Sequence, residues 1–154
     1  MEHLTRAELE ALVQRAFGPS PDEEEVLILV DLPDREVPDT PAWRSLRDLA
    51  ASWAAALDGS RFRCRLFGLR NARRNNADLP GVAWPLDPGR MPGAAEDLDP
   101  SAAASLEDLL ASRPLVLAPT RFSATAPLKR MAARIGFRGA TLPGFTSAMV
   151  PALR

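Results

Sequence analysis

The segment Val26–Val30 reads Val-Leu-Ile-Leu-Val, a continuous apolar run rich in β-branched residues. Such a run predicts a strand that is covered on both faces, which is typical of a parallel sheet. We place this strand at Glu25–Leu32. Asp31 stands at its carboxyl end, and ligands bind outside this end of the strands in open α/β sheets. The segment therefore indicates both the fold class and a place for a site.

Amphipathic helices precede and follow this strand. Leu4–Phe17 carries its apolar residues on one face, and Thr5 with Glu8 forms the pattern of a capping box. Thr40 is a suitable N-cap for a second helix that begins at Pro41 and continues to about Leu57. The order helix, strand, helix predicts that the next strand lies parallel to the first.

The next strand is expected at Ser60–Leu69, where arginines alternate with apolar residues. This alternation predicts a half-buried strand at a sheet edge, with Arg61, Arg63 and Arg65 on the outer face. Cys64 falls on the apolar face, where packing is the expected role rather than reactivity.

No regular element is predicted between residues 70 and 100, a segment with many prolines and glycines. Structureless stretches of this length inside a domain are functional or disordered. The elements expected after it are a helix at Ser101–Ala111, a strand at Pro114–Ala118, a helix capped by Thr125 or Ser123 that ends at Gly136, a strand at Arg138–Leu142 and a terminal helix fragment at Thr146–Leu153. The sequence therefore predicts one α/β domain over residues 1–154, with an open, mostly parallel, Rossmann-like sheet of about four strands and helices on its faces.

Composition excludes several classes of function. The formal net charge of −1 disfavours bulk electrostatic binding to nucleic acid or to an anionic membrane. No apolar run is long enough to cross a bilayer, no signal peptide is visible, and one cysteine fits a reducing compartment, so we expect a cytoplasmic protein. With one histidine, His3, and no tyrosine, a catalytic triad or a histidine-rich zinc site is not expected. Neither a GxGxxG nor a P-loop motif is present, and we expect no cofactor and no metal.

Polar residues gather in the long loop and after the third strand. The arginine cluster that reaches into the loop is either a solvated strand surface or a patch for carboxylates and phosphates. Consecutive asparagines can bond a ligand backbone or form turns, and a loop tryptophan is either an anchor or a ligand contact. The candidate peptide-binding residues are Arg70, Arg73, Arg74, Asn75, Asn76, Asp78, Trp84, Thr120, Ser123 and Thr125.

The carboxyl-terminal part of the chain resembles a known family. Leu115–Thr125 reads LVLAPTRFSAT and Gly139–Thr146 reads GATLPGFT, which is similar to the N-terminal domain of M29-type metallo-aminopeptidases and the related dihydroxypyridine dioxygenases. Val26–Pro33 and Asn75–Pro80 are consistent with the same family. The resemblance implies an α/β fold and a surface adapted to peptides. It does not imply peptidase activity, because the family's metal ligands belong to a separate C-terminal domain and no residue here matches them.

Three functions follow as hypotheses. The first is a non-catalytic accessory protein that binds a peptide substrate or leader peptide and presents it to a partner enzyme in ribosomal-peptide natural-product biosynthesis. The second is a subunit of a split metallo-aminopeptidase or dioxygenase, with the metal domain on another chain. The third is a structural module that forms a homodimer through the arginine-striped strand.

Overall fold

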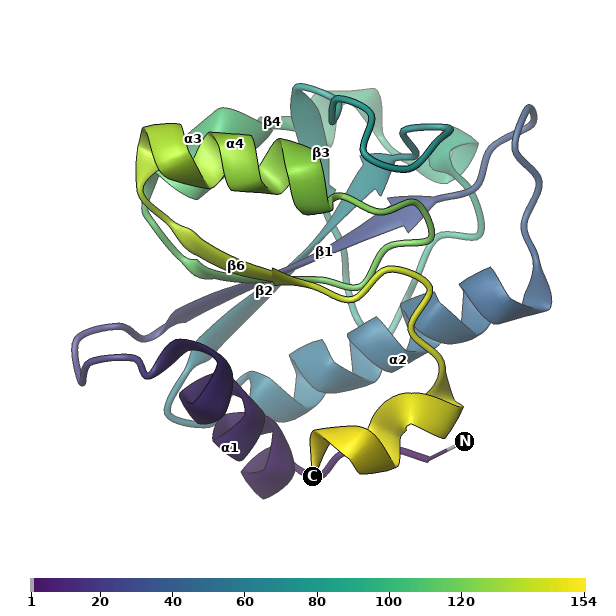
Figure 1. The fold of residues 1–154 in the computed structure, drawn as a ribbon. Coiled ribbons are helices and arrows are strands. Elements are labelled where there is room, and N and C mark those ends of the chain that lie inside the picture. The colour runs from purple at the N-terminus through teal and green to yellow at the C-terminus, as the bar shows by residue number, and fades with distance from the viewer. Residues whose placement is uncertain (1) are drawn as a thin grey trace.

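A six-stranded sheet forms the centre of the computed structural model, which describes residues 2–154 (Figure 1). The strands stand in the order β4-β3-β2-β1-β5-β6. Their bounds are β1 Glu25–Leu32, β2 Arg63–Arg70, β3 Val82–Pro85, β4 Ala104–Ser105, β5 Leu115–Ala118 and β6 Arg138–Thr141. β2, β1, β5 and β6 are mutually parallel, whereas β3 and β4 are each antiparallel to their inner neighbour. The α/β class is confirmed, but the sheet is mixed and larger than the expected four strands.

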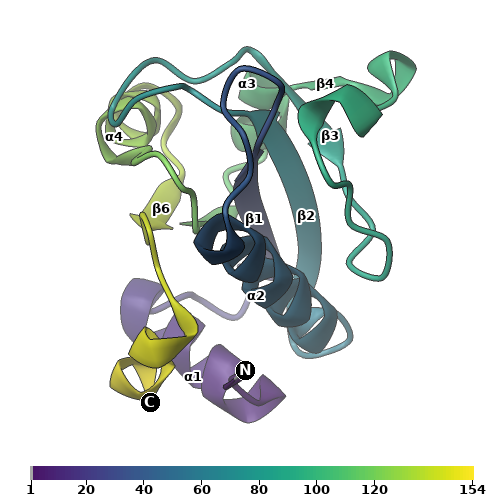
Figure 2. The ribbon, with the colours of Figure 1, turned by 90° about the vertical axis from the view of Figure 1, so that its right-hand side faces the viewer.

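Helices cover both faces of the sheet. One face carries α1 (Arg6–Phe17), α2 (Pro41–Leu57) and the terminal 3₁₀ helix η3 (Ser147–Leu153), and the other carries α3 (Leu106–Ala111) and α4 (Thr125–Ile135) (Figures 1 and 2). β1 is buried on both sides, because its even-numbered residues pack toward α1 and α2 and its odd-numbered residues toward α3 and α4. The continuous apolar run is thus the common wall of two cores.

The first two helices begin where their capping residues predict. Thr5 Oγ1 accepts a hydrogen bond from the Glu8 N–H, and the Glu8 carboxylate accepts one from the Thr5 N–H at 2.8 Å. In α2, Thr40 Oγ1 accepts from the Trp43 N–H at 3.1 Å, and Pro41 is the first helical residue. These caps satisfy N–H groups that have no partner within the helix, so local sequence defines both helix starts.

The prediction that the second strand lies at a sheet edge is wrong. β2 lies between β1 and β3, which pairs with its outer side near Phe67. On β2, Arg63 and Arg65 both reach the Glu25 carboxylate of β1, at 3.6 and 3.7 Å. Cys64 packs against the core as expected, and burial raises the pKa of its thiol to about 12. The arginine stripe is therefore a face of an inner strand rather than an open edge.

The segment 70–100 is ordered, contrary to the prediction that it has no regular element. It contains β3 and the short 3₁₀ helices η1 (Ala95–Asp97) and η2, which spans Pro100–Ala102. Trp84 of β3 is buried, and its Nε1–H donates to the Asp99 carbonyl at 2.9 Å. Trp84 is thus the anchor that fixes this segment to the sheet.

The helix expected at Ser101–Ala111 is about half as long in the structure. η2 and the two-residue strand β4 occupy its first part, and α3 begins only at Leu106. Ser105 is the N-cap and accepts from the Asp108 N–H at 3.2 Å. Pairing of β4 with β3 prevails over helix propensity here, because it satisfies the outer backbone groups of β3.

An ion pair between the buried Arg47 and the half-buried Asp39 lies at the start of α2. Arg47 is only 3% exposed, and its guanidinium donates to both Asp39 oxygens, at 3.0 and 2.7 Å. The Arg47 guanidinium holds the pKa of Asp39 below its ordinary value of 3.8. Removing one partner would leave the other charge uncompensated within the protein.

We predict that Asp39→Asn lowers the free energy of unfolding by about 3 kcal/mol at neutral pH, measured by urea denaturation. The double variant Asp39→Asn/Arg47→Met should recover most of this loss, because it leaves no buried charge. Since the folded pKa of Asp39 is lowered, its contribution is complete above the ordinary pKa and disappears as the pH falls through the lowered one. A single variant as stable as the wild type would contradict the prediction.

Candidate functional site

A buried carboxylate organises the carboxyl end of the parallel strands. Asp31, at the end of β1, is 4% exposed. Its Oδ1 accepts from the Arg121 N–H at 2.8 Å and from Trp43 Nε1–H at 2.9 Å, and its Oδ2 accepts from the Phe122 N–H at 3.0 Å. Burial raises the pKa of Asp31, and these donors act in the opposite direction. Asp31 therefore joins β1, α2 and the β5–α4 loop at one point.

This point coincides with the topological switch of the sheet. From β1 the chain continues to β2 on one side, and β5 lies on the other side, so the crevice between the ends of β1 and β5 is where an open α/β sheet binds its ligand. Two loop N–H groups that could face a bound anion there donate instead to Asp31. The protein's own carboxylate occupies the anion position.

The predicted polar loop residues lie together, and they bind one another. The Asn76 N–H donates to the Ser123 carbonyl at 2.7 Å, and the Ser123 N–H donates to Asn75 Oδ1 at 2.9 Å. Asn76 Oδ1 accepts from the Ala126 N–H in the first turn of α4 at 3.1 Å. Ser123 Oγ accepts from the Thr125 N–H at 3.3 Å, and Thr125 Oγ1 is 2.7 Å from Thr141 Oγ1. These contacts clamp the loop after β2 onto the start of α4.

The expectation that Ser123 or Thr125 is the N-cap of this helix is wrong. The N-cap position is Ala124, whose side chain makes no capping hydrogen bond. Asn76 supplies the missing acceptor from a loop that is distant in sequence. With its first amides bonded within the chain, the start of α4 offers little to an anion.

The other predicted residues are divided between internal contacts and solvent. Thr120 is buried, and its hydroxyl donates to the Phe122 carbonyl at 2.6 Å. Asp78 pairs with Arg130 at 2.9 Å, and Arg73 pairs with Glu36. Arg70 lies over the Trp84 ring at 5.5 Å, and Arg74 is exposed, without a hydrogen bond or ion pair to residues 2–154. A role of these residues in peptide binding stays a prediction.

Sequence reasoning did not single out Asn71, which completes the same network. Its side chain is buried, and Nδ2 donates to the Leu32 carbonyl at 3.0 Å and to Asp34 Oδ2 at 3.1 Å. Its Oδ1 accepts from the Arg73 N–H, so it supports the left-handed backbone at that residue. Asn71 follows a strand and bonds a neighbouring loop, so it belongs to no helical or strand periodicity. The sequence therefore carried no signal for it.

An open groove lies beside the edge strand β6. It has a volume of about 380 Å³ between α4 and β6, and Leu128, Ala132 and Phe137 supply apolar walls. Gly139 also lines the groove, and a Cβ there would make ordinary contacts, 3.5 Å from the Phe137 ring and 3.6 Å from Val116. We call this cavity the β6 groove. A glycine within a strand can mark a close approach by another backbone, and this was the one sequence signal for the groove.

The outer backbone of β6 has free hydrogen-bonding groups beside the groove. β6 ends the sheet, and its inner side pairs with β5. The Leu142 N–H donates inward to Ala118, so strand alternation directs the N–H and C=O groups of Gly139 and Thr141 outward. An extended chain can bond these groups and place a side chain in the groove.

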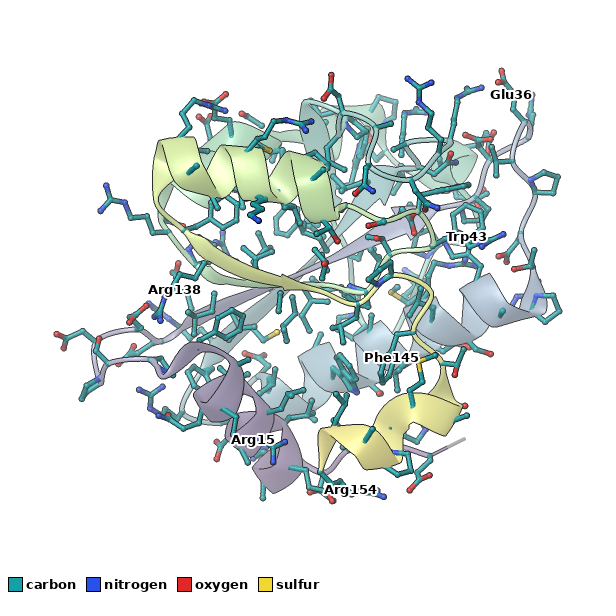
Figure 3. The ribbon with its side chains drawn as sticks, in the orientation of Figure 1. Arg15, Glu36, Trp43, Arg138, Phe145 and Arg154 are labelled. Atoms are coloured by element: carbon teal, nitrogen blue, oxygen red, sulfur yellow. The ribbon has the colours of Figure 1, made fainter. Side chains whose placement is uncertain are left out.

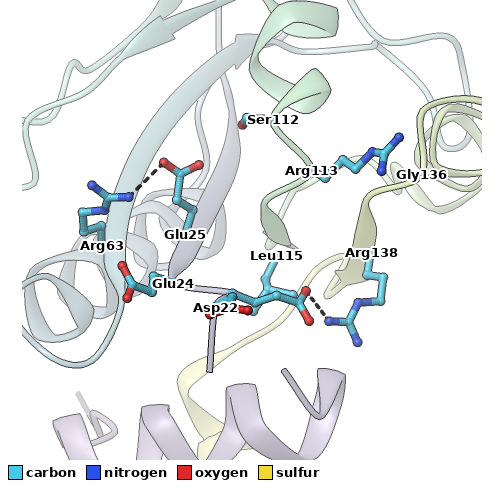
Figure 4. Close-up of a pocket in the computed structure, with 10 residues that line it drawn as sticks. Asp22, Glu24, Glu25, Arg63, Ser112, Arg113, Leu115, Gly136 and Arg138 are labelled. Atoms are coloured by element: carbon cyan, nitrogen blue, oxygen red, sulfur yellow. Dashed lines mark hydrogen bonds and ion pairs between the residues drawn. The ribbon is translucent and has the colours of Figure 1, made fainter. Parts of the chain in front are cut away.

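A second cavity begins where the β6 groove ends. It has a volume of about 570 Å³ and lies at the amino ends of β1, β2, β5 and β6, and we call it the amino-end cleft (Figure 4). Arg138, the first residue of β6, lines both cavities and pairs with Glu23. This ion pair lowers the pKa of Glu23. Arg138 and Trp43 mark the two ends of the sheet in Figure 3.

Comparison of the chain with protein-family models, curated proteins and solved structures finds no match. The resemblance to the aminopeptidase N-terminal domain therefore stays a prediction. Within residues 2–154, no helix is both long and apolar enough to cross a bilayer. The same residues contain no cluster of three or more histidine, cysteine, aspartate or glutamate side chains arranged to hold a metal ion.

We predict that Asp31→Asn lowers the free energy of unfolding by about 1–3 kcal/mol. Both carboxylate oxygens of Asp31 accept N–H donors, and in the variant an NH₂ group would replace one of these oxygens and face a donor. Urea denaturation measures the loss, and amide exchange should become faster at Arg121 and Phe122. Asp48→Asn is the matched control, since Asp48 is exposed on α2 and its side chain makes no hydrogen bond to the described residues. Equal stability of the two variants would contradict the assignment of Asp31.

Proposed function

We propose that the chain is a peptide-binding module that holds an extended peptide as an additional strand beside β6. The observation that carries this proposal is the unpaired edge of β6, which lies beside the apolar β6 groove. Main-chain hydrogen bonds to such an edge supply affinity, and pockets for alternate side chains supply specificity. The backbone of Gly139 and Thr141 would form the bonds, and the walls of the groove would receive an aliphatic side chain.

Charge favours an acidic peptide. No carboxylate lines the β6 groove, whereas Lys129 and Arg138 stand at its rim. Lys129 makes no ion pair with residues 2–154, whereas the Arg138 guanidinium is bonded to Glu23 and to the Phe17 carbonyl, so Lys129 is the cation available to a ligand. Complementary charge steers association and excludes wrong partners. A second copy of the chain would bring the same basic rim against itself, so the occupant is a different polypeptide with aliphatic and acidic residues.

An accessory role is part of the same proposal. A peptide that pairs with β6 keeps its outer backbone edge and the side chains of its other face accessible. A partner enzyme can therefore reach the peptide while the module holds it. This is the accessory role hypothesised from the sequence, with a substrate or leader peptide of a ribosomal-peptide pathway as the cargo.

We predict that a labelled peptide of about eight residues with alternating glutamate and valine, acetylated and amidated at its ends, binds the protein in fluorescence anisotropy. Gly139→Leu should weaken binding by at least about tenfold. The added Cβ makes ordinary contacts at 3.5–3.7 Å, and the rest of the leucine side chain is expected to fill the groove. Gly81→Leu is the matched control. Gly81 directly precedes β3, near the β4 edge of the sheet, and a Cβ at this residue meets nothing within 4 Å.

Chemical variants of the peptide test the pairing itself. N-methylation of alternate amides should abolish binding in one register, in which the methyl groups face β6, and should be tolerated in the other. A peptide with lysine in place of glutamate should bind more weakly. Absence of binding, or equal affinity of the wild type and Gly139→Leu, would overturn the proposal.

A further inference from the structure

We infer that the β6 site recognises the C-terminal end of a polypeptide, with the peptide antiparallel to β6 and its terminal carboxylate at the guanidinium of Arg113. This inference rests on the proposed function and adds the direction of the peptide and the class of its end group. It goes beyond the groove, because Arg113 lies in the neighbouring amino-end cleft.

The two cavities follow one another along the edge strand. Phe137, Arg138 and Gly139 line the β6 groove, and Gly136 and Arg138 line the amino-end cleft. A peptide that pairs with Gly139 and Thr141 therefore reaches the cleft at the first residue of β6. If the peptide is antiparallel, the end that arrives there is its C-terminus.

Arg113 is the free cation at this position. It is exposed and forms no hydrogen bond or ion pair through its side chain with residues 2–154. It follows α3 in the left-handed region, at φ 56°, with its N–H bonded to the Leu110 carbonyl at 2.9 Å. Its side chain lies along Gly136, where a Cβ would stand 3.5 Å from Nε and 3.7 Å from Cζ. The backbone thus places a guanidinium beside the start of β6 (Figure 4).

The remaining charges of the cleft leave Arg113 available. Arg63 pairs with Glu25, and Arg138 pairs with Glu23. Asp22 and Glu24 form no ion pair with residues 2–154, and Figure 4 shows them on the side of the cleft away from Arg113. A guanidinium binds a carboxylate through two parallel hydrogen bonds, which makes a free C-terminus a better partner than an amide.

Three versions of the glutamate–valine peptide separate the end groups: both ends capped, only the carboxylate free, and only the amine free. We expect the free carboxylate to increase affinity about tenfold over the capped peptide in wild-type protein. Arg113→Asn should abolish this advantage and leave the affinity for the capped peptide unchanged. Asparagine tolerates the left-handed backbone, so the variant should melt at or above the wild-type temperature.

Arg35→Asn is the control for loss of one exposed arginine whose side chain makes no hydrogen bond or ion pair with residues 2–154, and it should keep the advantage of the free carboxylate. Equal binding of the free-acid and capped peptides by the wild type would overturn this inference while the strand-addition proposal stands. Tighter binding of the free-amine peptide would also overturn it, because it would place the N-terminus near Asp22 and Glu24. Failure of all three peptides to bind would refute the proposed function itself.

Discussion

The arrangement of loops at the carboxyl end of the parallel strands depends on the hydrogen bonds of the Asp31 carboxylate. Three donors from α2 and the β5–α4 loop converge on one buried side chain. Trp43, which supplies one donor, also contacts Phe122 edge to face at 5.8 Å, so the polar and aromatic contacts hold the same loop. Because a buried carboxylate without these donors would be costly, the loop has one favourable position.

This closure explains why the candidate binding surface lies elsewhere. In open α/β sheets the switch point usually remains available for a ligand, and loop amides bind its anionic group. Here Asp31 takes the loop amides, and Asn76 takes an amide in the first turn of α4. The same polar residues that predict a ligand site from sequence thus stabilise the end of the sheet. The outer backbone groups of Gly139 and Thr141 on β6 form no hydrogen bond with residues 2–154 and remain available to another chain.

Sequence reasoning succeeded where a structure is defined by neighbours in the chain. The apolar run at Val26–Val30 and the Thr40 cap each act within a few residues, and both predictions are confirmed. It failed where distant partners decide. β3 has four residues and exists because it pairs with β2, and α4 is capped by Asn76 from another loop. The β6 groove had only Gly139 as a signal, since its walls come from two elements whose packing no local pattern describes.

The two edges of the sheet differ in a way that bears on function. At one edge, β4 has only two residues, which leaves little backbone for another chain to pair with. At the other edge, β6 has four residues, a glycine and an adjoining groove. An open edge is an aggregation hazard unless charge protects it, and Lys129, which is exposed and forms no ion pair with residues 2–154, supplies that charge. The same lysine that repels a second copy of this edge attracts an acidic strand. A single arrangement can therefore prevent self-association and select a partner, which is why we regard the β6 edge as a binding site rather than an unprotected end of the fold.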